Sequence, residues 1–511
     1  MKILVGALHA GYYRNLESVI AKLAAREHDI YLGSERHMSA LGGDSVVDGL
    51  CERPNVTRGV VPRREKDGFF VSVKVRLALD YLRYLAPEYA ETDALLKRSV
   101  VRTPSGIVWL AQRRPFSSQR GRRLLQGALD TIDHAMEPSP AIERFLDQQR
   151  PDVVLITPLV GLVPSSQLDL LRSAHARGIP TGVCVWSWDH LSSKAIIRDW
   201  PDRLFVWNDV QKHEAVEMHG IPEARIVVTG AQNFDRWFGR TPSRDRETFA
   251  ARVGLPDAGP FVMWVCSALF PGSPSEAEFV MQWVRQIRES ADPAVRNVSI
   301  LIRPHPSRAK EWEGIDWARY GRTALWGGNP VDEQSRADYF DSLHHSAAVV
   351  GLNTSAFIEA GIVGRPVLAI LPPEFRTNQE ATLHFRYLQT VGGGLLTTSR
   401  SLSEHVDQLS QMIVEPPPEV LARQREFVKA FVRPHGLNVS ATMVMTKAIE
   451  DLAQLKPAPK APRASRAGRL GLSLLHAMER SASARRFLLN EREMESKRRR
   501  AEEEHREVSW I

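Results

Sequence analysis

Cysteines, long apolar runs and the common nucleotide-binding signatures are scarce or missing in this 511-residue sequence. The three cysteines, Cys51, Cys184 and Cys266, lie far apart, and two of them fall within predicted strands. This spacing fits neither a disulfide framework nor a zinc site, so we expect free thiols in a reducing cytoplasm. No run of about 18 apolar residues occurs, so no membrane-spanning helix is predicted. The opening segment, residues 1–8, is too short for the apolar core of a secretory signal.

Several motifs with a known mechanism are absent. The sequence contains no Gly-x-Gly-x-x-Gly, no Walker loop, no Cys-x-x-Cys and no His-Glu-x-x-His. These absences remove the main support for a dinucleotide-dependent oxidoreductase, a P-loop NTPase or a zinc protein. An Asp-x-Asp pair that could bridge a metal to a diphosphate is missing too, so we expect no metal and no cofactor. A bound diphosphate would then be neutralised by arginine, helix dipoles and backbone N–H groups.

The net charge of +7 is concentrated at one end of the chain. Residues 456–511 contain 14 Lys and Arg against 8 Asp and Glu, which is a net of +6. The remaining 455 residues are therefore close to neutral. A near-neutral body with a basic tail argues against a nucleic-acid-binding protein.

A second basic segment lies at residues 97–126, which carry eight Lys and Arg, no acidic residue, and the aromatic residues Trp109 and Phe116. One interpretation is a solvated face that packs through its aromatics. The other is a surface that contacts an anionic membrane, a role open to the basic tail as well. We accordingly expect a cytoplasmic protein, with peripheral contact at the inner face of the membrane as a further hypothesis.

Apolar runs alternate with helical patterns through most of the chain, which predicts an α/β protein with parallel sheets. In the first half, strands are expected at 2–8, 29–32, near 60, 152–157, 181–186, 204–207 and 225–229. In the second half they are expected at 261–266, 298–303, 348–352 and 367–371. No such alternation is found between 69 and 149, where the pattern is helical.

Four segments follow from these patterns. Residues 1–240 form a first Rossmann-like domain with a helical insertion at about 69–149, and 241–417 form a second. Two helices at 418–455, broken near 433–436, are expected to return to the first domain and help close the cleft. Residues 456–511 read as a basic linker followed by a charged helix with a thin apolar stripe, which we expect to be exposed or partner-dependent. Removing this tail should leave the body folded.

The strongest functional signal is a pair of strand-to-turn segments in the second half, at 300–308 and 347–360. Because ligands of open α/β sheets lie beyond the carboxyl ends of the strands, the two turns should share one rim. The polar residues on this rim are Arg303, His305, Arg308, Asn353, Thr354 and Ser355. Two arginines and a helix N-terminus suit phosphate, and Glu359 one turn later could accept from ribose hydroxyls. The rim is predicted to be a nucleotide-diphosphate site.

Two features of this half allow a structural interpretation as well. His305, held between two prolines, either bonds a phosphate, transfers a proton, or merely caps the preceding strand. Ser267 and Gly272 follow the first strand of this half, either as contacts of the donor phosphates or within an ordinary surface loop.

In the first half, candidates for the acceptor site follow predicted strands. His9 could take the proton of an acceptor hydroxyl, because its pKa lies near neutrality, or could be a loop histidine bonded to backbone. Asp189 is a second candidate base, and Trp188 could stack on a sugar ring, although a structural Trp–Asp contact is equally compatible. Arg14 could orient an anionic acceptor, and Asp235 lies on the rim near the connection between the halves.

The motifs Arg303-Pro-His-Pro306 and Asn353-Thr-Ser355, with Glu359-Ala and Gly364-Arg-Pro366, resemble those of two-domain GT-B transferases of surface-carbohydrate synthesis. CDP-glycerol glycerophosphotransferases and capsular-polysaccharide enzymes are the most similar, and the resemblance covers residues 1–455. It implies two Rossmann-like domains facing a cleft. It also implies that Arg303, His305, Thr354 and Ser355 contact the donor phosphates and that Glu359 holds the ribose. The teichoic-acid enzymes usually have a different serine-rich turn at 353–355, and the tail has no counterpart.

The expected function is therefore metal-independent transfer of a sugar or sugar-like group from a nucleotide-activated donor to a hydroxyl. The acceptor would be a saccharide or a lipid-linked molecule in cell-surface polysaccharide synthesis, and His9, Asp189 and His305 are the candidate catalytic residues. Two alternatives remain open, a UDP-N-acetylglucosamine 2-epimerase-type isomerase and a non-catalytic scaffold of the same fold.

Overall fold

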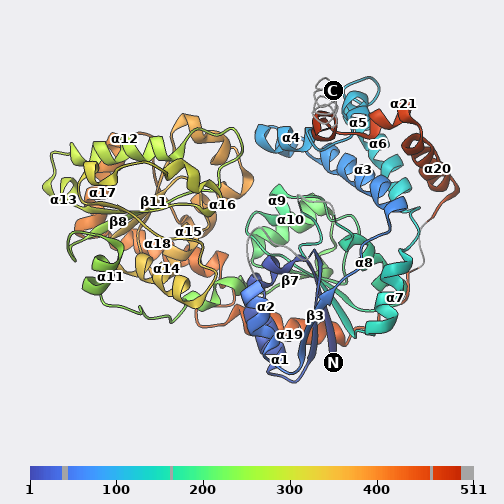
Figure 1. Cartoon of the computed structure of the whole chain (residues 1–511), viewed down its shortest axis with the longest axis horizontal. Helices are drawn as coiled ribbons and strands as arrows, with labels where there is room; N and C mark the ends of the chain where they lie inside the picture. The colour runs from blue at the N-terminus through green and yellow to red at the C-terminus, as the bar shows by residue number, and fades with distance from the viewer. Residues whose placement is uncertain (37–43, 162–164, 461–463, 497–511) are drawn as a thin grey trace, which may run out of the picture.

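Two parallel β-sheets organise the chain in this computed structural model, which describes residues 1–36, 44–161, 165–460 and 464–496 (Figure 1). The first sheet has the strand order β3-β2-β1-β4-β5-β6-β7 and the second has the order β10-β9-β8-β11-β12-β13. The strands of the first sheet are β1 Lys2–His9, β2 Asp29–Arg36, β3 Val56–Val60, β4 Val153–Thr157, β5 Thr181–Cys184, β6 Arg203–Val206 and β7 Ile226–Val228. Those of the second are β8 Phe261–Val265, β9 Ser299–Arg303, β10 Thr323–Leu325, β11 Ala348–Gly351, β12 Val367–Ile370 and β13 Thr397–Ser399.

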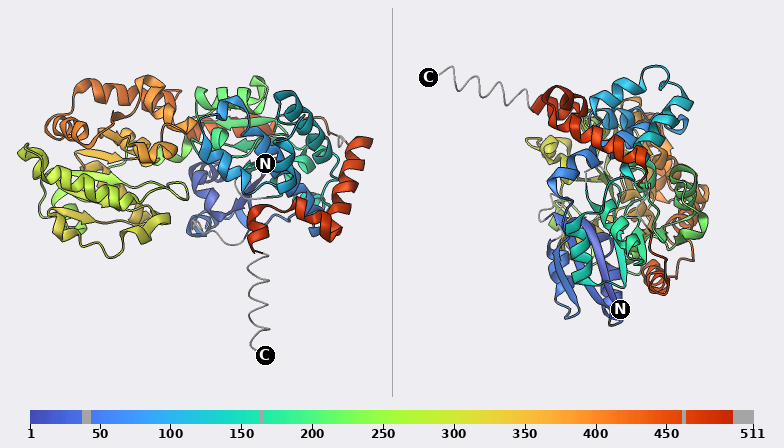
Figure 2. Two further views of the ribbon diagram at one scale, coloured as in Figure 1. Left: turned by 90° about the horizontal axis from the view of Figure 1, so that it is seen from above. Right: turned by 90° about the vertical axis from the view of Figure 1, so that its right-hand side faces the viewer.

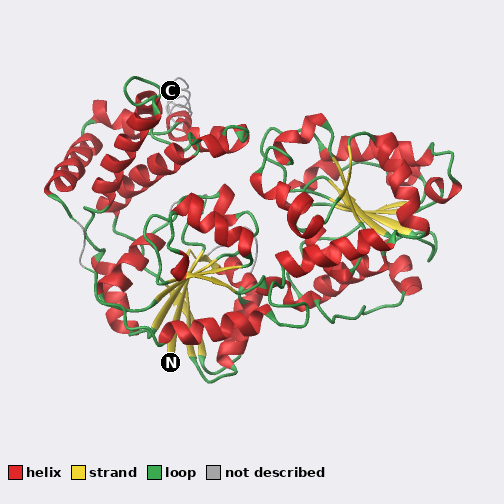
Figure 3. Ribbon diagram, turned by 180° about the vertical axis from the view of Figure 1, so that it is seen from behind, coloured by secondary structure: helices red, strands yellow, loops and turns green. Residues whose placement is uncertain are grey.

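The central strands are buried over their whole length because helices cover both faces of each sheet (Figure 3). This explains why the sequence shows continuous apolar runs instead of alternation. Helices of the first domain, the unit built on the first sheet, include α1 Glu17–Ala24, α2 Asp44–Cys51, α8 Gln167–Ala176, α9 His190–Ser193 and α10 Asp209–His219. Those of the second domain include α11 Arg246–Val253, α12 Glu276–Arg288, α14 Glu333–His345, α15 Ala356–Val363, α16 Leu383–Thr390 and α17 Leu402–Val414.

The two sheets share one topology. Each begins with a central strand, adds the next two strands on one side, and then crosses back to add the remaining strands on the other side. This is the doubly wound order, and its topological switch points lie between β1 and β4 and between β8 and β11. The predicted α/β class with two Rossmann-like domains is confirmed, and the pairing of two such domains is the GT-B-like arrangement.

Two strands were not predicted from the sequence. β10 and β13 have three residues each and form the two edges of the second sheet. Such short edge strands carry little apolar pattern, and their place is set by pairing with β9 and β12.

The predicted insertion is a helical layer over one end of the first sheet, formed by α3 Lys66–Arg83, α4 Asp93–Val100, α5 Ser105–Ala111, α6 Gln119–Asp133 and α7 Pro140–Gln149. A buried ionic network fixes α3 to the domain. Arg76 on α3 bonds Asp133 at 3.0 Å and Asp169 on α8 at 2.8 Å. Arg172 joins the same network by bonding Asp133 at 2.6 Å.

The chain returns from the second domain to the first through α18 Pro418–Phe431 and α19 Ala441–Ala453. Met445, Ile449 and Leu452 on α19 belong to the same apolar core as α1 and β1. Arg26, just after α1, also bonds Glu450 at 2.6 Å. Helix α19 is thus a layer of the first domain, although it follows the second domain in sequence.

The tail differs from the expected exposed helix. Helix α20 Arg466–Arg480 lies against α6 and α3, and α21 Ala482–Arg485 continues along the insertion. Gly468 and Gly471 permit this approach, since a Cβ on either would come within 3 Å of α6 or the residues that follow it. Leu472 and Leu475 pack on the core of the insertion. The apolar stripe in the sequence is thin because two glycines take part in this contact beside the two leucines. We call the insertion (66–149) and the tail (464–496) together the helical cap.

Candidate functional site

Ser267 and Asn353 meet at the switch point of the second sheet. Ser267 follows β8, Asn353 follows β11, and the backbone N–H of Asn353 donates to Oγ of Ser267 at 3.1 Å. The N–H of Ser267 donates in turn to Oε2 of Glu276 at 2.8 Å. Burial raises the pKa of Glu276 to about 8 despite that bond, so this carboxyl holds a proton at neutral pH. The turn after β8 and the turn after β11 are therefore joined directly.

The turn after β11 presents unused backbone donors. Within the described part of the chain, the N–H groups of Thr354 and Ser355 donate to no acceptor. They precede α15, whose N-terminus carries a partial positive charge. The side-chain oxygen Oδ1 of Asn353 is buried and has no partner among the described residues either. Two aligned N–H donors at a helix start form the geometry that binds a phosphate group.

The Arg303 guanidinium already contacts other protein groups, so it is not free to bind a phosphate. Its guanidinium lies 4.2 Å from the centre of the Tyr339 ring and donates to the carbonyl oxygen of Gly328 at 2.6 Å. Gly327 is needed beneath it, because its φ is +106° and a Cβ there would come within 2.3 Å of Arg303 Nη1. Arg303 is mostly buried, and burial lowers the pKa of its guanidinium. Its charge remains close to the rim while its direct contacts fix Tyr339.

Tyr339 orients Glu359, the residue predicted to bind the ribose. The hydroxyl of Tyr339 donates to Glu359 Oε2 at 2.5 Å. Burial raises the pKa of Glu359, and the positive charges of Arg236, Arg303 and Arg14 act in the opposite direction. One carboxylate oxygen is thus held in place, and Oε1 has no partner among the described residues.

His305 is held as a neutral donor. The N–H of Ser307 donates to Nδ1 of His305 at 3.2 Å, so the ring proton lies on Nε2. Burial lowers the pKa of His305, and the charges of Arg308 and Arg14 lower it further. Arg308 forms an ion pair with Glu311 and donates to the carbonyl oxygen of Pro274 at 3.2 Å. His305 Nε2–H is the available donor of this turn.

Arginines from both domains converge on Glu359. Arg14 follows β1, and within the described residues its side chain has no hydrogen bond or ion pair. Burial lowers the pKa of Arg14, with Glu359 raising it and Arg336 lowering it again. Arg336 on α14 bonds Glu17 of the first domain at 3.1 Å, and Arg236 lies 3.7 Å from the same carboxylate. Four arginines (14, 236, 303 and 336) are close to the two carboxylates of Glu359 and Glu17, so arginines outnumber these carboxylates here.

On the first domain, an aromatic row leads away from β1. The rings of His9 and Tyr12 are 4.6 Å apart, those of Tyr12 and Trp186 are 5.2 Å apart, and Trp186 contacts His190 at 5.9 Å. His9 therefore lies at the carboxyl end of β1, next to aromatic surface of the kind that binds sugar rings. His190 itself is buried, and burial lowers its pKa to about 4.

Asp189 and Trp188 lie at a contact between the domains. Asp189 accepts from Lys194 at 2.7 Å, from Ser193 Oγ at 2.7 Å and from Ser187, and these contacts outweigh burial and hold its pKa well below the usual range. Such a carboxylate is a weak base. Trp188 is buried and packs edge-on against His384 of the second domain at 4.7 Å. Its ring is occupied by this contact.

Asp235 and Gly272 lie outside the cluster. Asp235 accepts two bonds from Arg433, at 3.0 and 2.6 Å, together with Ser440 Oγ and the N–H of Thr442, both at 2.7 Å. It therefore fastens the return of the chain into α19. Gly272 is exposed in the 267–273 loop with a φ of +84°.

Sequence reasoning did not find Tyr339, Arg236, Arg336 or Glu276. Arg336 and Tyr339 lie on α14, whose sequence carries no motif, and only the packing of α14 beside α15 brings them to Glu359. Glu276 is the first residue of α12, directly after its N-cap Ser275. Among the described residues, no three His, Cys, Asp or Glu side chains are grouped so that they could hold a metal ion.

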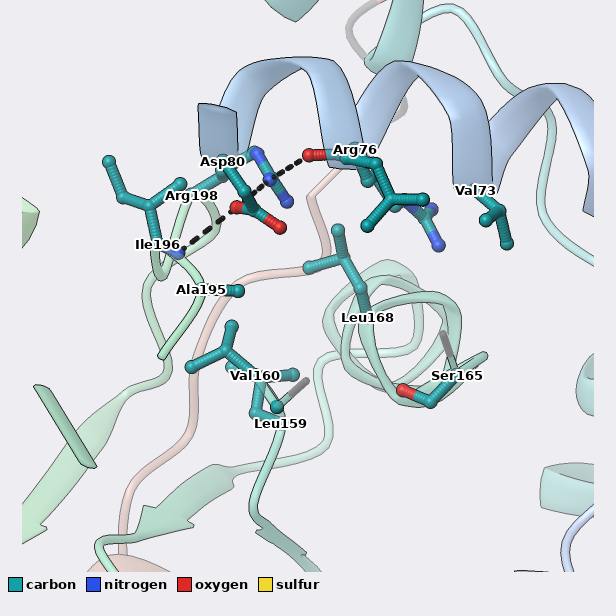
Figure 4. Close-up of a pocket in the computed structure, with 12 residues that line it drawn as sticks. Val73, Arg76, Asp80, Leu159, Val160, Ser165, Leu168, Ala195, Ile196 and Arg198 are labelled. Carbon is teal, nitrogen blue, oxygen red and sulfur yellow. Dashed lines mark hydrogen bonds and ion pairs between the residues drawn. The ribbon is translucent and has the colours of Figure 1, made fainter. Parts of the chain in front are cut away.

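A separate small cavity lies between α3 and the first sheet (Figure 4). Its volume is about 60 Å³, far below the roughly 300–1,000 Å³ of ligand pockets. Its wall is apolar on one side, with Leu159, Val160 and Leu168, and carries Arg76, Asp80 and Arg198 on the other. It is a packing gap beside the ionic network and cannot hold a nucleotide.

Comparison with known proteins gives structural but no sequence relatives. No family model matches the sequence, and no curated protein is similar to it. A glycosyltransferase from Rickettsia africae ESF-5 aligns at 9% identity and a TM-score of 0.49, covering 89% of this chain and 99% of that one. A UDP-GlcNAc 2-epimerase from Neisseria meningitidis, bound to UDP-GlcNAc, aligns at 10% identity with a TM-score of 0.48. The alignment covers 88% of this chain and 100% of the epimerase. The calicheamicin glycosyltransferase CalG4 aligns at 13% identity with a TM-score of 0.45, over 88% of this chain and 98% of CalG4.

Since these TM-scores are below 0.5, the GT-B-like assignment rests on the strand orders and the paired domains described above. No helix of the described residues is long and apolar enough to cross a bilayer.

Proposed function

We propose that this protein is a glycosyltransferase-like enzyme that transfers a sugar or sugar-like group from a nucleotide-activated donor to a hydroxyl acceptor. The acceptor is a saccharide or lipid-linked molecule of cell-surface polysaccharide synthesis, and no metal is required. The observation that carries the proposal is the pair of unused N–H donors at Thr354 and Ser355, located at a topological switch point. A diphosphate placed there would face Arg14 and His305 and be neutralised without a metal.

The donor site has the parts that this reaction needs. The N–H groups before α15, the Nε2–H of His305 and the surplus positive charge of the cleft stabilise a leaving nucleoside phosphate. Glu359, oriented by Tyr339, accepts from the ribose hydroxyls through Oε1. Arg303 positions this pair instead of binding the phosphate directly.

In the transfer step, the acceptor hydroxyl gives its proton to a base while its oxygen bonds to the carbon of the transferred group. The bond from that carbon to the phosphate oxygen breaks, and the nucleoside phosphate leaves with the electron pair. Of the two predicted bases, His9 is favoured. Asp189 is committed to Lys194, and its lowered pKa makes it a poor proton acceptor.

A panel of nucleotides tests the donor site. UDP, CDP, GDP, CMP and their sugar conjugates are added separately, and the thermal midpoint is measured. A specific ligand at a hundred times its dissociation constant should stabilise the fold by roughly 2.7 kcal/mol. Replacing His305 by alanine should weaken this effect, whereas the exposed Arg319→Ala in the same domain should not. No stabilisation by any of the nucleotides would contradict the proposal and favour a scaffold.

The reaction is then distinguished from isomerisation. The stabilising nucleotide sugar is incubated with the protein alone, and the sugar is examined by NMR. A transferase returns it unchanged in the absence of an acceptor, while an epimerase inverts its configuration. Epimer formation without an acceptor would replace the transferase assignment by the isomerase one.

A further inference from the structure

The helical cap lies at one end of the molecule, over the first domain (Figures 1 and 2). The basic segment 97–126 and the basic tail, separate candidates in the sequence, are both part of it. Helix α20 of the tail lies along α6 of the insertion, and the backbone N–H of Ser105 at the start of α5 donates to the carbonyl oxygen of Leu489 at 3.0 Å. The two basic segments therefore form one surface.

This surface exposes large apolar side chains. Leu470 and Leu474, one turn apart on α20, are 74% and 61% exposed. Leu124 on α6 is 70% exposed and Trp109 on α5 is 55% exposed. Phe487, also largely exposed, is adjacent to α5, since a Cβ on Gly106 would lie 3.2 Å from its Cβ. Such exposed apolar side chains, carried by the neighbouring helices α5, α6 and α20, mark a candidate interaction site.

The same helical cap carries exposed arginines. They are Arg113, Arg114, Arg120 and Arg123 of the insertion, and Arg466, Arg469, Arg485 and Arg486 of the tail. Residues 105–128 and 464–478 contain no Asp or Glu. The Arg113 guanidinium lies over the Trp109 ring at 4.9 Å and that of Arg486 over the Phe487 ring at 5.0 Å. Cationic and apolar groups are therefore interleaved on the surface.

We propose that the outer face of the helical cap docks on an anionic lipid bilayer. Arginines meet the negative headgroups, and Trp109, Leu124, Leu470 and Leu474 enter the headgroup–acyl boundary. Charge complementarity selects this occupant, because the face carries eight exposed arginines and a protein partner would need a matching acidic and apolar groove. The proposal is independent of the proposed reaction, since it concerns a surface on the cap and not the cleft between the sheets.

Sedimentation of the full-length protein with vesicles tests the docking. The probes are vesicles of phosphatidylcholine alone and of phosphatidylcholine with phosphatidylglycerol, at low and high salt. The wild-type protein should sediment with the anionic vesicles only, and less so at high salt. The variant R113Q/R114Q/R120Q/R123Q should lose about fivefold in affinity per arginine in contact with the surface. The variant L470S/L474S should bind more weakly at both salt concentrations.

Matched variants of the second domain serve as controls. R296Q/R319Q/R376Q/R425Q removes four other exposed arginines, and V414S replaces a valine that is 72% exposed on α17. Both should sediment like the wild type, and circular dichroism should show all variants folded. An equal loss of vesicle binding in the control variants would overturn the proposal. So would a wild-type protein that does not sediment with anionic vesicles. Concentration-dependent self-association that L470S/L474S abolishes would overturn it too, by identifying the face as a protein interface.

Discussion

Tyr387 of the second domain donates a hydrogen bond of 2.7 Å to Oε1 of Glu214 in the first. Both lie in the contact between α16 and α10, and Glu214 is fully buried there. Burial raises the pKa of Glu214 from its ordinary value of 4.5 to about 7. A carboxyl with a raised pKa favours the folded state while it is protonated, and this contribution is lost as the pH rises from about 4.5 through about 7.

The first prediction concerns this contact. Chemical unfolding followed at pH 5 and at pH 8 should show that the wild type loses stability relative to Glu214→Gln as the pH rises, because the amide does not ionise. The comparison with this variant separates the carboxyl from buried histidines such as His190 and His384, whose lowered pKa values act in the opposite direction. Some slope should remain, since the buried Glu276 also has a raised pKa. An unchanged pH difference in Glu214→Gln would show that this carboxyl does not titrate in the folded protein.

The second prediction concerns the fastening of α19. Asp235→Ala removes the partner of Arg433, whose side chain is only 9% exposed, and leaves a buried charge unpaired. The free energy of unfolding should fall by about 3–5 kcal/mol, measured by urea denaturation. The control is Asp257→Ala, which breaks the solvent-exposed pair with Arg322 and should leave the urea midpoint nearly unchanged. Equal effects of the two substitutions would contradict a fastening role.

The third prediction concerns the tail. The fragment 1–455 should still unfold cooperatively, because both sheets and α19 remain complete. Its cap should nevertheless loosen, since truncation uncovers the core packed by Leu472 and Leu475 and removes Glu493, the 2.5 Å partner of the buried Lys74. Hydrogen exchange should therefore become faster in α3 and α6 and stay unchanged in β8 and β9. Unaltered exchange in α3 would mean that the tail contributes nothing to the cap.

The fourth prediction concerns the cleft. Arg14→Ala should lower the affinity for the stabilising nucleotide by roughly ten- to a hundredfold, because it removes a charge-assisted partner of the phosphates. It should leave the thermal midpoint of the free protein unchanged or raise it, since Arg14 has no bond among the described residues to lose. Titration calorimetry measures the affinity. A lower midpoint with unchanged affinity would assign Arg14 a structural role instead.

The fold could be predicted from the sequence wherever a strand is buried on both faces. Runs such as 261–265 and 348–351 are apolar throughout, and their order along the chain implies parallel pairing. The edge strands β10 and β13 could not be predicted, because three half-exposed residues carry no periodic signal. The packing of α20 on α6 could not be predicted, because two glycines take part in the contact and leave only Leu472 and Leu475 as its apolar signal.

For the site, the rim of strand-end residues was predictable, since topology alone brings residues 303–308 and 353–359 together. Individual roles were not. The sequence cannot show that Arg303 stacks on Tyr339. It cannot show either that Asp189 forms an ion pair with Lys194, or Asp235 with Arg433. These relations depend on tertiary neighbours more than thirty residues away, or on side-chain orientation within a loop. The predicted binding roles of the rim residues remain predictions.

The position of α19 has a consequence for biosynthesis. Its apolar face completes the core around α1 and β1, yet it is translated after the whole second domain. While the ribosome synthesises residues 241–440, α19 is not yet present to cover the core of the first domain. Val19, Ile20 and Leu23 of α1 would then be accessible to chaperones. The core of the amino-terminal domain is therefore complete only after residue 453 has been synthesised.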